Sequence, residues 1–168
     1  MERVKVLISN RQKKIKIPTG IRLLIRRCCH AVLEFEKMDG DFEVSVSFVD
    51  NENIRSLNSQ YREKDVPTDV LSFPLGCDGT YDINQETGAQ MLGDIVISME
   101  KAVEQAETYG HTLRREVAYL TVHSVLHLIG YDHEDGGIEM VRMREKEEAV
   151  LMSLGLPRGE SYVLTDET

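Results

Sequence analysis

Hydrophobic positions follow two periods along the chain, and each period predicts a type of element. Apolar and polar side chains alternate over residues 42–48 and again over residues 92–97, so we expect a half-buried strand in each range. Shorter runs containing Val, Ile and Leu predict further strands at residues 4–9, 14–17 and 70–73. The spacing therefore favours a sheet built from both ends of the first hundred residues.

In other segments, apolar positions recur three and four residues apart, as on the buried face of a helix. The expected helices span residues 19–35, 50–61, 98–110, 112–129 and 138–154. Four of these ranges begin at a residue whose side chain can cap a helix, namely Thr19, Asp50, Ser98 and Thr112. Residues 76–90, rich in Gly, Asp, Thr and Asn, should form a loop. The pattern predicts one α+β domain over residues 1–168, with a mixed, roughly four-stranded sheet whose face is buried by helices.

Length and composition agree with this single domain, since 168 residues suffice for one substantial core. No apolar run approaches membrane-spanning length, and the polar residues 1–5 lack the core of a signal peptide. Cys28, Cys29 and Cys77 are odd in number and form no CxxC motif, so we expect reduced thiols. We therefore expect a cytoplasmic protein that does not contact a membrane.

Charge is unevenly distributed along the chain. The formal net charge of −9 argues against a general nucleic-acid binder. Residues 1–30, however, hold nine of the 20 Lys and Arg residues and a single acid, Glu2. Four of these cations lie close together in the sequence: Arg11, Lys13, Lys14 and Lys16. They could face phosphate groups or could form an ordinary solvated surface, and charge alone favours neither.

Three of the five histidines fall within eleven residues, as His123, His127 and His133. Residues four apart stand on the same face of a helix, so the first two can aim their imidazoles at one ion. Gly130 permits the left-handed backbone that ends a helix, which would let the chain turn back and bring His133 to the same ion. Three neutral nitrogens around a tetrahedral ion leave a position for water, as in catalytic zinc sites.

An isolated pair of histidines is more often a chance spacing than a metal site, but two features favour the metal here. The third histidine follows a glycine stop, and the surrounding helix is apolar on nearly every side. Such a helix is buried, and buried imidazoles need polar partners, which a metal provides. Zincin peptidases carry a glutamate after the first histidine as general base, whereas this chain has Ser124 there. Peptide hydrolysis by that mechanism is therefore excluded.

Three ordered motifs resemble one known family. They are HSVLHLIGYDH at residues 123–133, LNSQYREKDVPTDVLSFP at residues 57–74, and LGDIVI at residues 92–97, the last followed by Arg115-Glu116. Together they resemble the YbeY family of bacterial metal-dependent endoribonucleases, and the resemblance covers about residues 44 to 155. The family usually has glycine at the position of Ser124.

The resemblance implies a zinc-dependent endoribonuclease, specific for single strands, that acts in ribosomal RNA processing and ribosome quality control. It implies one Zn²⁺ held by the three histidines, with Arg62 and His123 as catalytic residues. A guanidinium offers donors that match phosphate oxygens, although an arginine in this position is more often a surface ion-pair partner. The implied partners are ribosomal RNA, as a small-subunit precursor, and the ribosome or its proteins. No residue stands out as a general base, and nothing indicates the oligomeric state.

Other residues near these motifs have open roles. Thr68 and Asp69 suit local capping, and Asp132 could orient an imidazole or bond to the turn backbone. Met143 could lie beneath the metal site or simply belong to the core of the last helix. Two other functions remain open: a metallohydrolase of a peptide or amide, and a non-catalytic ribosome-assembly factor stabilised by zinc. A metal whose four ligands all come from the protein would favour the latter.

Overall fold

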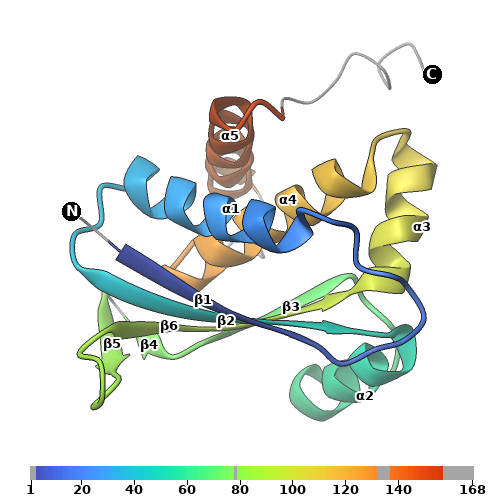
Figure 1. The fold of residues 1–168 in the computed structure, drawn as a ribbon, viewed down its shortest axis with the longest axis horizontal. Coiled ribbons are helices and arrows are strands. Elements are labelled where there is room, and N and C mark those ends of the chain that lie inside the picture. The colour runs from blue at the N-terminus through green and yellow to red at the C-terminus, as the bar shows by residue number, and fades with distance from the viewer. Residues whose placement is uncertain (1–2, 78, 132–136, 157–168) are drawn as a thin grey trace.

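A computed structural model describes residues 3–77, 79–131 and 137–156 of the chain (Figure 1). Three long strands run parallel in the order β1 (Arg3–Asn10), β2 (Asp41–Val49) and β6 (Gln90–Ser98). The other edge of β6 carries two antiparallel strands, β3 (Val70–Pro74) and β5 (Thr80–Ile83). The sheet is therefore mixed, as the sequence predicts.

Five helices flank this sheet in the described part of the chain. α1 (Ile21–Phe35) and α4 (Leu113–Leu128) cover one face, and α3 (Met99–Tyr109) and α5 (Gly137–Ser153) stand on the same side (Figure 1). α2 (Asn51–Arg62) lies against the opposite face, where it closes a small second core. The α+β fold class is thus confirmed.

Capping side chains begin three of the predicted helices. Asp50, Ser98 and Thr112 accept hydrogen bonds from the backbone amides of the third residue of α2, α3 and α4. The prediction that Thr19 caps α1 is wrong, because Gly20 occupies the N-cap position with φ 90° and no side chain makes a cap bond there.

The expected strand at residues 14–17 is wrong. The buried side chain of Gln12 accepts a hydrogen bond from the Ile15 amide at 2.8 Å and donates one to the Ile15 carbonyl, also at 2.8 Å. These bonds close a compact turn and use backbone groups that a neighbouring strand would otherwise need. Lys13, Lys14 and Lys16 are therefore exposed on an irregular segment and not on a hairpin.

The expected loop at residues 76–90 is wrong in part, because it contains paired strands. β4 (Gly76–Cys77) pairs with β5, which pairs in turn with the start of β6. Two short antiparallel strands therefore lengthen the four-stranded sheet at one end.

Gly93 allows β3, β6 and α4 to approach closely. Its φ is 145°, and an added Cβ would lie 2.3 Å from the Phe73 carbonyl oxygen and 2.9 Å from Leu128 Cδ2. A side chain there would push apart the strand and the helix end that border the functional site.

Candidate metal centre and substrate cleft

α4 carries two histidines whose rings converge. Eleven of its sixteen residues are buried, yet His123 and His127 keep partial access to solvent. Their Nε2 atoms lie 3.2 Å apart. A tetrahedral ion with bonds of about 2.0–2.1 Å holds its ligand nitrogens about 3.3–3.4 Å apart. The two imidazoles therefore fit a shared zinc ion without rearrangement.

Glu147 of α5 fixes the orientation of His123. Its carboxylate Oε2 lies 2.5 Å from His123 Nδ1, and its side chain is only 5% exposed. An ionised carboxylate can only accept, so Nδ1 carries the proton and the lone pair of Nε2 is left for a metal. Carboxylates play this part behind most zinc-bound histidines.

Sequence analysis missed Glu147, although a signal was present. Met143, Glu147, Val150 and Leu151 form the buried positions of α5, and the glutamate is the one charged residue among them. A charge within an apolar helical stripe needs a partner. Met143 is 1% exposed and lines a small hollow together with His123 and Glu147, so it packs in the core and also lies beside the site.

The third proposed ligand, His133, and its neighbour Asp132 lie outside the described residues. Within the described ranges, no three His, Cys, Asp or Glu side chains form a metal-binding group, so the third ligand stays a prediction. The turn that leads toward it follows the expected course, because Gly130 has φ 114° and the Tyr131 amide bonds to the Leu126 carbonyl.

The start of this turn is anchored to two helices. The Tyr131 hydroxyl donates to Glu36 Oε1 at 2.5 Å, and the Lys146 ammonium donates to Glu36 Oε2 at 2.9 Å. Lys146 also lies 5.1 Å from the centre of the Tyr131 ring. The chain that continues to the predicted third ligand is thus tied to both α1 and α5.

Arg62 lies in the same cleft as the two histidines. The cleft has a volume of about 670 Å³ and is bounded by β3, the end of α2 and the C-terminal half of α4. Arg62 is the last residue of α2. The structure therefore brings the predicted cation and the predicted ligands to one cavity, although its catalytic role stays a prediction.

Thr68 and Asp69 also line this cleft, and they make local bonds. The Asp69 carboxylate accepts from the Val70 amide at 2.7 Å and from the Thr68 hydroxyl at 3.4 Å. These contacts are those of a residue that caps the start of β3.

Comparison with known proteins identifies the family of this fold and site. Residues 7–155 match the family model described as Endoribonuclease YbeY. An endoribonuclease YbeY from Caldanaerobacter subterraneus subsp. tengcongensis is 54% identical over 158 residues, covering 91% of this chain and 99% of that protein. The endoribonuclease YbeY of Alkaliphilus metalliredigens is 47% identical over 157 residues, with coverages of 92% and 98%.

A solved structure shares the fold as well. The solution structure of TM1509 from Thermotoga maritima superposes with a TM-score of 0.55 at 27% sequence identity, covering 90% of this chain and 92% of that one. These matches define the chain as an endoribonuclease, a hydrolytic enzyme. Within that class, the chain belongs to the YbeY family. No helix in the described ranges is both long and apolar enough to cross a membrane.

Proposed function

We propose that this endoribonuclease depends on zinc and cleaves single-stranded RNA during ribosomal RNA processing and ribosome quality control. The observation that carries the proposal is the pair of imidazole nitrogens 3.2 Å apart, in the cleft that Arg62 also lines. The ribosomal substrate, a small-subunit precursor, and the contact with the ribosome or its proteins rest on the family resemblance.

His123, His127 and His133 would hold the ion, and neutral imidazoles are ligands that suit zinc. When bound, zinc supplies Lewis-acid chemistry, which polarises a phosphate oxygen or lowers the pKa of water to about 7. Glu147 contributes by holding His123 in one tautomer and one orientation.

Arg62 would bind the phosphate group that is cleaved. Its guanidinium can donate two hydrogen bonds to phosphate oxygens and stabilise the negative charge that grows in the transition state. Because Arg62 approaches from α2 and the histidines from α4, a phosphate in the cleft would lie between them.

The lining of the cleft supports a single-stranded substrate. Tyr61, Phe73 and Tyr131 contribute aromatic rings to it, and the first two pack edge to face with centroids 5.3 Å apart. Unpaired bases stack on such rings, whereas the bases of a duplex are already stacked on each other.

We also propose that the enzyme works in the cytoplasm. Its three cysteines are free, and two of them are buried side by side in α1. Reduced cysteines are typical of that compartment.

Cleavage of labelled ribosomal RNA by the zinc-loaded protein tests the proposal. His123→Ala should lose zinc and cleavage together. Arg62→Ala should keep the zinc content and melting temperature of the parent but cleave about 10²–10³-fold more slowly, as when one transition-state donor is removed. Arg55→Ala is the matched control, because Arg55 is also on α2 but pairs with Asp65 away from the cleft.

Two outcomes would contradict the proposal. Parent-like cleavage by His123→Ala would exclude the metal site as the seat of the reaction. Parent-like cleavage by Arg62→Ala would remove Arg62 from the mechanism while leaving the metal site in place.

A further inference from the structure

A second cavity of about 320 Å³ borders the substrate cleft. Asp69 lines both cavities, and the ring of Tyr119, which lines the second, lies 5.8 Å from the ring of His123. Glu116, also in the second cavity, precedes His123 by seven residues of α4, which is about 10 Å along the helix axis. A nucleotide next to the cleaved phosphate could therefore place its base there.

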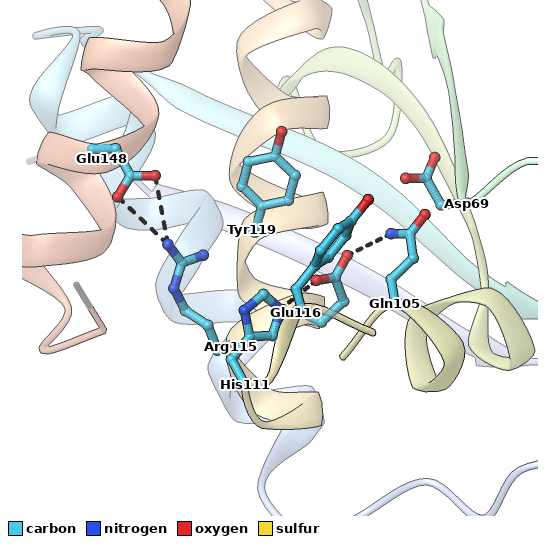
Figure 2. A pocket seen from close by; sticks show the side chains of 8 residues that line it. Asp69, Gln105, His111, Arg115, Glu116, Tyr119 and Glu148 are labelled. Carbon is cyan, nitrogen blue, oxygen red and sulfur yellow. Dashed lines mark hydrogen bonds and ion pairs between the residues drawn. The ribbon is translucent and has the colours of Figure 1, made fainter. Parts of the chain in front are cut away.

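Glu116 is the fixed acceptor of this cavity. It is 2% exposed, and its two carboxylate oxygens accept from Gln105 Nε2 at 2.6 Å and from His111 Nε2 at 2.5 Å. Figure 2 shows the carboxylate held between these two side chains, with Asp69 on the Gln105 side. Each oxygen keeps a further lone pair, so the group can accept from a ligand without giving up its own bonds.

Arg115 offers a buried donor in the same cavity. The residue is 6% exposed, and its Nη2 makes only a long bond of 3.4 Å to Glu148. Its buried Nε has no hydrogen-bond partner among the residues that the structure describes. A buried donor of this kind requires an acceptor, which a ligand in the cavity would supply.

The chemistry of the lining selects among possible ligands. Three carboxylates, Asp69, Glu116 and Glu148, face a single guanidinium, so a phosphate group would be repelled. No metal-binding cluster of three His, Cys, Asp or Glu side chains occurs in the described part of the chain, which disfavours a bare metal ion. A nucleobase with an exocyclic amino group fits, because it donates to a carboxylate and accepts at a neighbouring ring atom or carbonyl.

We propose that this cavity is a base subsite of the RNA-cleaving centre, which prefers bases that carry an amino group over uracil. The proposal rests on the proposed function, since it takes RNA as the substrate. Glu116 and Asp69 would accept from the amino group.

Titration of the zinc-loaded protein with CMP and with UMP tests the preference, because cytosine carries an amino group where uracil has a carbonyl. Neither mononucleotide contains a cleavable diester, so binding is measured apart from cleavage. We expect CMP to bind about tenfold more tightly, as one hydrogen bond to a charged group provides. The side-chain amide resonance of Gln105 should shift with CMP, which locates the base in this cavity.

Two variants and a control complete the test. Glu116→Gln should bring the ratio of the two affinities close to one at parent zinc content. If this buried substitution prevents folding, Gln105→Leu tests the same network at a half-buried position and should also lower the ratio. Glu107→Gln changes an exposed carboxylate of α3 outside the cavity and should leave the ratio at the parent value.

The outcomes separate this proposal from the proposed function. Equal binding of CMP and UMP by the parent, or a Gln105 resonance that does not move, would overturn the base subsite even if the same sample cleaves RNA. A CMP preference that Glu116→Gln abolishes would support the subsite, even if labelled ribosomal RNA were left intact and the proposed function failed.

Discussion

Glu147 allows a quantitative test of the metal centre, because it touches a proposed ligand without being one. Its carboxylate lies 2.5 Å from His123 Nδ1, on a side chain that is 5% exposed. In Glu147→Gln the charge is lost, and the amide nitrogen can face the ring without accepting its proton. Loss of such a partner typically weakens metal binding 10–100-fold, which is about 1.4–2.7 kcal/mol. We expect the dissociation constant for zinc to rise by that factor.

Competition against a coloured zinc chelator measures this change directly. Glu145→Gln is the matched control, since it makes the same substitution on an exposed face of α5 two residues earlier. Melting temperatures of the metal-free proteins reveal any loss of stability that is unrelated to zinc. If Glu147→Gln binds zinc as tightly as the parent and the control, the inferred orientation of His123 by Glu147 is refuted.

Three further predictions concern the fold, the thiols and the basic segment. Gly93→Ala should lower the melting temperature by on the order of 10 °C, because the new methyl group meets the Phe73 carbonyl at a strained φ, whereas calorimetry of Gly88→Ala, where nothing lies within 4 Å, should show a smaller loss. Only the exposed Cys77 should react with a thiol reagent at neutral pH, so a native-state titration that modifies more than one thiol would contradict the structure. Burial raises the pKa of the Cys28 thiol from about 9 to about 12, so the unfolded chain loses this proton first and the free energy of unfolding should fall as pH rises from about 9 to about 12; a Cys28→Ala variant should show a weaker fall in denaturant titrations. If the exposed basic segment binds RNA, charge reversal at three of its residues should weaken binding and flatten its salt dependence at constant zinc content, whereas an unchanged slope would assign these side chains to solvent: Lys13, Lys14 and Lys16.

Local signals made much of the fold predictable. Caps act within one turn, so Asp50, Ser98 and Thr112 marked the starts of α2, α3 and α4 correctly. Residues 14–17 alternate like a strand, but the turn around Gln12 depends on side-chain bonds that periodicity does not reveal. β5 is short and largely polar, and only its pairing with β6 makes it a strand.

The site shows the same division between local and distant information. The spacing of His123 and His127 follows from helix geometry alone, and the structure confirms that their rings converge. Glu147 lies twenty or more residues beyond both histidines and reaches His123 only because α5 packs on α4. The bonds from Gln105 and His111 to Glu116 likewise join α3, the following turn and α4, so no single segment displays them.

X-ray absorption at the zinc edge of the loaded protein tests the proposed metal centre most directly. We predict one zinc per chain with three nitrogen ligands at about 2.0–2.1 Å and one exchangeable oxygen. His127→Ala should lose this signal, because its Nε2 lies 3.2 Å from that of His123 and faces the same ion. A zinc with four protein ligands, or one that His127→Ala binds unchanged, would contradict a catalytic site at these histidines.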